Sequence, residues 1–155
     1  MIESFANAFR GIALCLQYER NMRVHFVATC YVVYMAYRFY ELTRAEWIVL
    51  ILTCSAVVTS EAVNTAIELL TDKASPEYSA LAGAAKDTAA GAVLLASIAA
   101  IIVGFVLFWD LDTFAVVTEH FVVNTVDLII LIITVVLSVI FVRSGKRRRK
   151  RGVRK

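Results

Sequence analysis

Four long apolar segments, separated by short polar connections, constrain the fold of this chain more than any other feature. They cover residues 24–40, 47–70, 88–109 and 121–142. A transmembrane helix needs about 20 mostly apolar residues, so each segment is of a length that can cross a bilayer. The composition agrees, since 60% of the residues are hydrophobic and the mean hydropathy is +0.73. We therefore expect an all-α membrane protein with four transmembrane helices.

Residues 2–18 differ from these segments because polar and apolar positions are mixed. Four apolar positions recur at intervals of three and four residues, which is the spacing of one helix face: Phe5, Phe9, Ile12 and Leu16. This pattern predicts an amphipathic helix that lies in the membrane surface. An ordinary helix packed against the bundle is the alternative that the same pattern allows.

Basic residues are concentrated at the end of the chain. Residues 143–155 hold nine of the sixteen Lys and Arg, whereas residues 1–142 hold seven basic and thirteen acidic residues, a net charge of −6. The positive-inside rule then places the basic tail in the cytoplasm and, with four spans, the N-terminus and residues 71–88 on the same side. Residues 109–120 become an outer loop. Because only the tail has a net positive charge, we expect no nucleic-acid partner.

The tail and the fourth segment allow more than one role. We interpret residues 143–155 as a signal that stops transfer and sets the orientation of the chain. Binding of anionic lipid head groups and stabilisation of an oligomer are the alternatives.

The second apolar segment carries a polar stripe. Glu61, Asn64, Glu68 and Asp72 follow one another at intervals of three and four residues, so they share one face of a helix. Acidic groups at membrane depth are costly and usually face a protein interior or a wet cavity, which makes this stripe a functional candidate. The predicted topology places Glu19, Lys86 and Asp87 at the same cytoplasmic side.

These residue types suit phosphoryl transfer but do not demand it. Mg²⁺ prefers carboxylate and phosphate oxygens, Lys86 offers a cation for phosphate, and Glu61 could accept a proton from a lipid hydroxyl. The sequence has no Gly-x-x-x-x-Gly-Lys-Ser/Thr loop. Transport of a cation or proton, or structural contacts that hold a bundle together, explain the stripe equally well at this level.

Three blocks of sequence add to this picture: Glu-Arg-Asn-Met-Arg-Val-His at 19–25, Glu-Ala-Val-Asn-Thr-Ala-Ile-Glu at 61–68 with Asp72, and Ala-Lys-Asp-Thr-Ala-Ala-Gly-Ala-Val-Leu at 85–94. Their residues, order and separation resemble the small prokaryotic membrane lipid kinases, the diacylglycerol kinase and undecaprenol kinase family. The resemblance covers about residues 1–108. It implies a surface helix and a three-helix transmembrane kinase core, assembled as a homotrimer with active sites between subunits. The fourth helix at 121–142 goes beyond that pattern.

The resemblance also implies roles for individual residues. Glu61 is the expected catalytic base, Glu19 and Glu68 are expected to hold Mg²⁺ with ATP as co-substrate, and Asn64 is expected to support the polar site. Further nucleotide contacts are expected at six positions: Asp72, Glu77, Tyr78, Ser79, Lys86 and Asp87. Ser79 stands where the family often has His, so a nucleotide contact there would be weakened or replaced.

The resulting hypothesis is an ATP- and Mg²⁺-dependent kinase of the bacterial plasma membrane, which phosphorylates the hydroxyl of a membrane lipid. The form Glu19-Arg20-Asn21 favours undecaprenol as the acceptor, with diacylglycerol as the alternative. A non-catalytic membrane bundle or a small cation transporter is the rival of another class.

Overall fold

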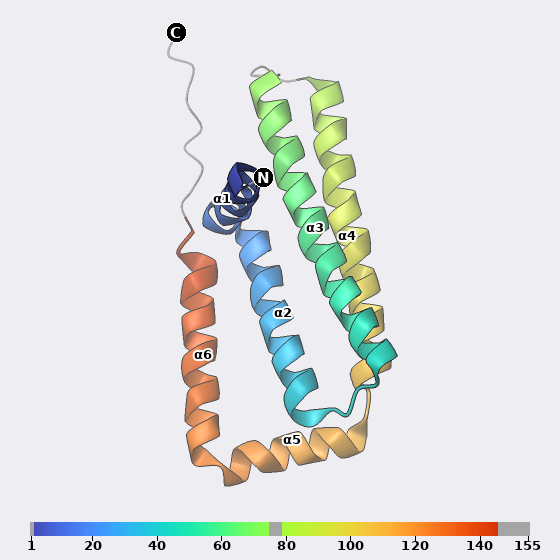
Figure 1. Cartoon of the computed structure of the whole chain (residues 1–155), viewed down its shortest axis with the longest axis vertical. Coiled ribbons are helices and arrows are strands. Elements are labelled where there is room, and N and C mark those ends of the chain that lie inside the picture. Colours follow the sequence, from blue (N-terminus) through green and yellow to red (C-terminus); the bar gives the residue numbers. More distant parts are fainter. Residues whose placement is uncertain (1, 75–78, 146–155) are drawn as a thin grey trace.

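The computed structural model describes residues 2–74 and 79–145 and is all-helical over these ranges (Figure 1). The helices are α1 (Ile2–Tyr18), α2 (Arg20–Phe39), α3 (Arg44–Ala74), α4 (Ala80–Phe108), α5 (Leu111–Val123) and α6 (Thr125–Arg143). The all-α prediction is therefore confirmed. Glu77, Tyr78 and residues 146–155 of the basic tail lie outside the described residues.

α1 forms an amphipathic helix, seen nearly end-on beside the start of α2 in Figure 1. Its apolar face points away from the other helices, since Phe5, Phe9 and Ile12 are 62%, 69% and 52% exposed. Burial in a membrane surface would remove these side chains from water. The structure thus favours the surface helix over a helix packed on the bundle.

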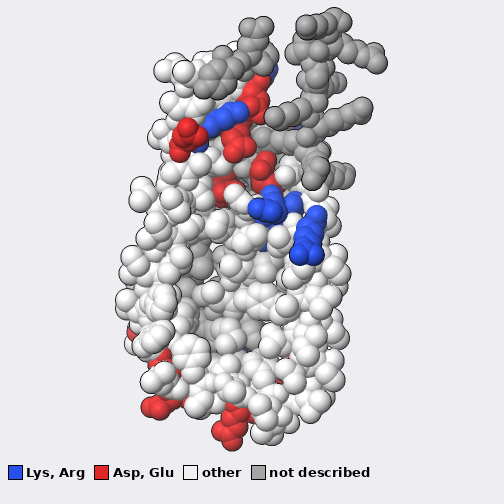
Figure 2. Space-filling view, turned by 180° about the vertical axis from the view of Figure 1, so that it is seen from behind, with Lys and Arg blue, Asp and Glu red and all other residues white. Residues whose placement is uncertain are grey.

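Three helices in the described part of the chain are long and apolar enough to cross a membrane: α3, α4 and α6. α2 covers the span expected at 24–40 but does not reach the same apolar character, because Arg23, His25, Arg38 and its tyrosines interrupt the apolar residues. Figure 2 shows a broad uncharged zone across the middle of one face, with charged residues gathered towards both ends. This distribution is typical of a membrane protein.

The stretch expected as an outer loop at 109–120 instead forms most of α5, which crosses the end of the molecule between α4 and α6 (Figure 1). Asp110 explains where this helix begins, because its carboxylate accepts hydrogen bonds from the backbone N–H of Asp112 and the hydroxyl of Thr113. Such a cap satisfies N–H groups that a helix start leaves unpaired. As a result the apolar helix that corresponds to the fourth expected span begins at Thr125 and not at residue 121.

The core lies where α3 packs between α4 and α2. Its buried apolar side chains come from all three helices: Met22, Ala36, Leu50, Val57, Ala89 and Val93. α6 packs along α2, where the hydroxyls of Tyr31 and Ser138 form a hydrogen bond of 3.2 Å. This arrangement places one face of α3 towards the first turn of α2.

Candidate functional site

The polar stripe of α3 changes from buried to exposed along the helix. Glu61 and Asn64 are 2% and 7% exposed, Glu68 is partly buried, and Asp72 is exposed. Glu61 lies seventeen residues beyond Arg44, the first residue of α3. At 1.5 Å per residue this is about 26 Å along the helix, near the far boundary of a hydrocarbon core of about 30 Å. The stripe therefore runs from buried positions of α3 to its exposed end.

Glu61 has an acceptor without a partner. Its Oε2 atom is buried and makes no hydrogen bond with any described residue, and the same holds for Oδ1 of Asn64. Buried polar atoms are nearly always hydrogen-bonded, and leaving one unpaired costs about 1–3 kcal/mol. Two such atoms one helical turn apart indicate room for a hydrogen-bonding group that the described residues do not supply.

Three carboxylates come together around this position. Glu19 and Glu68 lie close enough to repel the carboxylate of Glu61 electrostatically. Glu19 is the single residue between α1 and α2, so the cluster joins two segments far apart in the sequence. Like charges in a poorly solvated site disfavour one another, and a bound cation or a shared proton relieves the repulsion.

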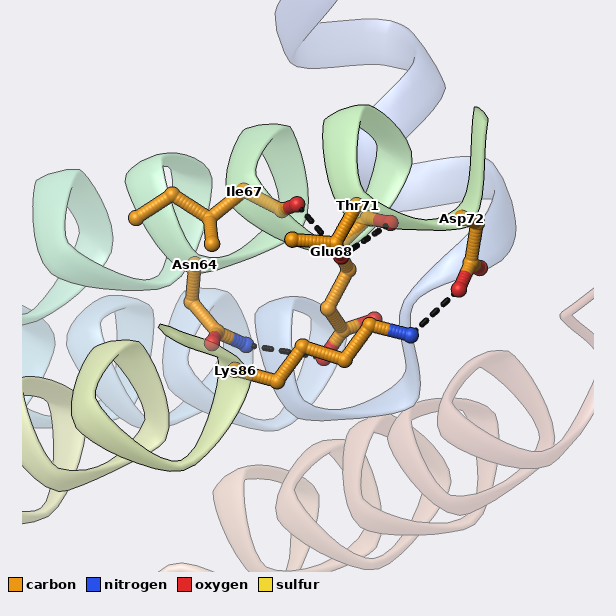
Figure 3. A network of polar contacts seen from close by, with 6 residues as sticks. All are labelled: Asn64, Ile67, Glu68, Thr71, Asp72 and Lys86. Atoms are coloured by element: carbon orange, nitrogen blue, oxygen red, sulfur yellow. Dashed lines mark hydrogen bonds and ion pairs between the residues drawn. The ribbon is translucent and has the colours of Figure 1, made fainter. Parts of the chain in front are cut away.

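Hydrogen bonds orient the side chains of the stripe towards the C-terminal end of α3 (Figure 3). The amide of Asn64 donates to Oε1 of Glu68 at 3.2 Å, while the hydroxyl of Thr71 donates to the backbone oxygens of Ile67 and Glu68 at 2.9 and 3.1 Å. Asn64 therefore sets the direction of the Glu68 carboxylate.

Lys86 of α4 forms an ion pair with Asp72 of α3 (Figure 3). The two side chains are 37% and 59% exposed, so the pair is accessible to solutes at the polar end of the bundle. This contact brings a cation next to the acidic stripe.

Other predicted site residues are not joined to this network. Ser79 caps α4, where its hydroxyl accepts from the backbone N–H of Ala82 at 3.4 Å. Asp87 is exposed on α4, and no hydrogen bond or ion pair links it to the described residues of the stripe. Glu77 and Tyr78 fall outside the described residues.

Arg23 is the residue that reasoning from the sequence missed. It lies in the block at residues 19–25 and was given no role, yet it is only 4% exposed and its guanidinium contacts three backbone oxygens. Its position four residues after Glu19 was the available signal, because that spacing puts both on one side of a helix start.

A metal could be held here only with help from a ligand. In residues 2–74 and 79–145 no group of three or more His, Cys, Asp or Glu side chains forms a ready-made metal site. Mg²⁺ nevertheless binds commonly through one or two carboxylates together with substrate phosphates. Glu19 and Glu68 are the candidates for that mode, because they are the two carboxylates that act electrostatically on Glu61.

Comparison with known proteins identifies a family for the part of the chain that carries this site. Residues 6–108, which contain most of α1, all of α2 to α4 and all the candidate site residues, match the model of a family described as prokaryotic diacylglycerol kinase. The helices α5 and α6 lie beyond the match.

Individual relatives are similar over the same region. The chain is 37% identical over 106 residues to an undecaprenol kinase of Bacillus subtilis, a match that covers 68% of this chain and 85% of that protein. It is 41% identical over 105 residues to a diacylglycerol kinase of Synechocystis, a match that covers 67% of this chain and 59% of that protein. A diacylglycerol kinase of Escherichia coli (strain K12) is 40% identical over 63 residues, a match that covers 41% of this chain and 52% of that protein.

Proposed function

The chain belongs to the prokaryotic diacylglycerol kinase family, and from this premise we propose that the carboxylates around Glu61 form the site at which it phosphorylates undecaprenol. The protein is a lipid kinase of membranes, with ATP as the phosphate donor. The non-catalytic bundle and the cation transporter, which the residues alone left open, are set aside because family members are lipid kinases.

The choice of undecaprenol is supported by the extent of the match. The relative named undecaprenol kinase is covered over 85% of its length, against 59% and 52% for two relatives named diacylglycerol kinase. The sequence Glu19-Arg20-Asn21 favours the same branch. Diacylglycerol is the alternative, since the relative from Synechocystis has the higher identity at 41%.

The observation that carries the proposal is the unpartnered oxygen of Glu61. A lipid hydroxyl held at the membrane boundary can hydrogen-bond to this buried Oε2 atom. Glu61 then takes the hydroxyl proton while the lipid oxygen attacks the γ-phosphorus of ATP and the bond to ADP breaks. Asn64 supports the same site, because its amide orients Glu68 and its own oxygen remains available to a ligand.

Mg²⁺ and ATP would bind next to Glu61, on the side of the C-terminal end of α3. Glu19 and Glu68 would hold Mg²⁺ together with ATP oxygens, and the bound cation would neutralise negative charge on the phosphates. Lys86 would exchange its contact with Asp72 for one with a phosphate. Asp87 follows Lys86 directly and Ser79 begins the same helix, so we retain both as nucleotide contacts along with Asp72, Glu77 and Tyr78.

We further propose a homotrimer in the plasma membrane, with α2, α3, α4 and α6 as spans and both termini in the cytoplasm. Large apolar side chains cover the outward surface of α4 and α6, which suits contact with lipid or with other subunits. The positive charge of the tail supports the orientation.

The test is phosphate transfer by the purified full chain in lipid vesicles. Labelled γ-phosphate would be followed from ATP to undecaprenol or diacylglycerol, offered separately and then together, with Mg²⁺ or with a chelator. We expect metal-dependent labelling of undecaprenol and a preference for it in the mixture. Preferential labelling of diacylglycerol would overturn the acceptor, and labelling that persists in the chelator would overturn the role of Mg²⁺.

A further inference from the structure

A buried arginine beside the candidate site joins the last turns of α1 and α6. Arg23 lies in the first turn of α2, and Nη1 of its guanidinium donates to the backbone oxygens of Leu16 and Gln17 at 3.0 and 3.1 Å. Its Nε donates to the backbone oxygen of Val142 at 3.2 Å. These acceptors belong to the last turns of α1 and α6, so one side chain connects three helices.

The chemistry of helix ends explains why a cation is stable there. The last four backbone oxygens of a helix lack partners within it, and they form the negative end of the helix dipole. α1 ends at Tyr18 and α6 ends at Arg143, so both negative ends meet the guanidinium of Arg23. Its flat fork of donors can serve several oxygens at once, which a lysine ammonium cannot match in geometry.

The hydrogen bonds of Arg23 span the bend at Glu19. Leu16 and Gln17 precede that residue, and Arg23 follows it by one helical turn. The backbone N–H of Glu19 also donates to the oxygen of Cys15 at 2.9 Å. The angle between α1 and α2 therefore depends on the hydrogen bonds of Arg23. This angle also sets the direction of the Glu19 side chain towards Glu61.

α6 holds the guanidinium of Arg23 as well, through the backbone oxygen of Val142. It is held along α2 by the hydrogen bond between Tyr31 and Ser138, which brings Val142 to Arg23. Gly145, just beyond α6, allows a close approach, because a Cβ atom at this position would overlap the guanidinium. α6 and Gly145 lie outside the region that matches the kinase family.

We propose that Arg23 is a positioning residue for Glu19, and that α6 holds Arg23 in place through the oxygen of Val142. The additional C-terminal helix thus supports the kinase site from the opposite side of α2. The proposal rests on the proposed function only in the role given to Glu19, which is to hold Mg²⁺ with ATP.

Three full-length variants test this coupling in lipid vesicles. Arg23→Lys keeps the charge but loses the planar guanidinium with its several N–H donors. Gly145→Ala places a methyl group against that guanidinium. Gly104→Ala is the matched control, because a Cβ atom there meets nothing within 4 Å. Amide hydrogen exchange of residues 15–23 reports the junction directly, without turnover, and initial rates are measured against MgATP and against lipid.

We expect faster exchange over residues 15–23 in Arg23→Lys and, to a smaller extent, in Gly145→Ala. The MgATP concentration for half-maximal rate should rise about 10- to 100-fold in Arg23→Lys, as for other groups that orient metal ligands. The lipid concentration for half-maximal rate should stay unchanged. A purely structural role would instead lower thermal stability without this selective effect.

Several results would overturn the proposal. Wild-type exchange in Arg23→Lys would refute the positioning role, and so would faster exchange without any change in the MgATP dependence. Identical behaviour of Gly145→Ala and Gly104→Ala would refute the part played by α6. Failure of the wild-type protein to transfer phosphate would overturn the proposed function instead, while the exchange data would still decide whether Arg23 and Gly145 fix the junction.

Discussion

Loss of the ion pair between Lys86 and Asp72 should have little effect on the stability of the protein but a large effect on its use of ATP. The side chains are 37% and 59% exposed, and solvent-exposed pairs contribute about 0–1 kcal/mol. Lys86→Met should therefore change the free energy of unfolding by less than about 1 kcal/mol. If Lys86 binds a phosphate of ATP, the variant also loses a hydrogen bond to a charged group, worth about 1.5–3 kcal/mol.

Such a loss corresponds to about a 10- to 150-fold decrease in kcat/KM for ATP, because each 1.4 kcal/mol is a factor of ten. The assay is the initial rate of lipid phosphorylation against ATP concentration, combined with thermal unfolding of the same sample. Lys73→Met is the matched control, since it removes the same charge from the last turn of the neighbouring helix α3. Equal effects of the two variants on kcat/KM would refute a specific contact between Lys86 and ATP.

Three further predictions concern other parts of the chain. Asn64→Leu removes the donor that orients Glu68, so the Mg²⁺ concentration for half-maximal rate should rise about 10- to 100-fold in a metal titration. Ser79→Ala removes the cap of α4 and should lower the free energy of unfolding by about 1 kcal/mol, whereas Ser79→Asp should retain it in the same denaturation experiment. A hydrogen bond from the hydroxyl of Thr113 holds the pKa of Asp110 below its ordinary value. The contribution of this carboxylate to α5 is therefore complete at neutral pH and is lost as the pH falls through the lowered pKa, which faster amide exchange of α5 in acid would reveal.

Periodicity and residue chemistry were sufficient for the parts of the structure that depend on a single helix. The spacing of Glu61, Asn64, Glu68 and Asp72 predicts one face, and the structure places them along one side of α3. The burial of Glu61 and the absence of a described partner for its Oε2 atom could not be deduced, because both depend on how α2 and α4 pack against α3.

The difference between the expected loop and the observed helix α5 has a physical cause as well. Residues 109–120 were expected as a loop because their charges suggested a polar connection, but the carboxylate of Asp110 caps a helix there. The span expected at residues 24–40 stays a prediction, because the charged and tyrosine side chains of α2 make this helix less apolar than α3, α4 and α6.

Arg23 shows the limit most clearly. Its bond to Val142 joins residues 119 positions apart, and no local pattern predicts which helix end will dock there. Its bonds to Leu16 and Gln17 likewise depend on the bend between α1 and α2. Contacts of this kind follow from the tertiary arrangement, which residue spacing along one helix does not determine.

The central claim is that Glu61 is the base of a lipid kinase site, and Glu61→Gln tests it most directly. The substitution keeps the shape of a side chain that is 2% exposed and removes a charge repelled by Glu19 and Glu68, so thermal stability should be unchanged or higher. The rate of phosphate transfer should fall about 100- to 10,000-fold, the usual contribution of a general base. Glu119→Gln, on the exposed surface of α5, is the control and should keep the wild-type rate. A Glu61→Gln protein that transfers phosphate at the wild-type rate, or that loses activity only because it no longer folds, would contradict the account.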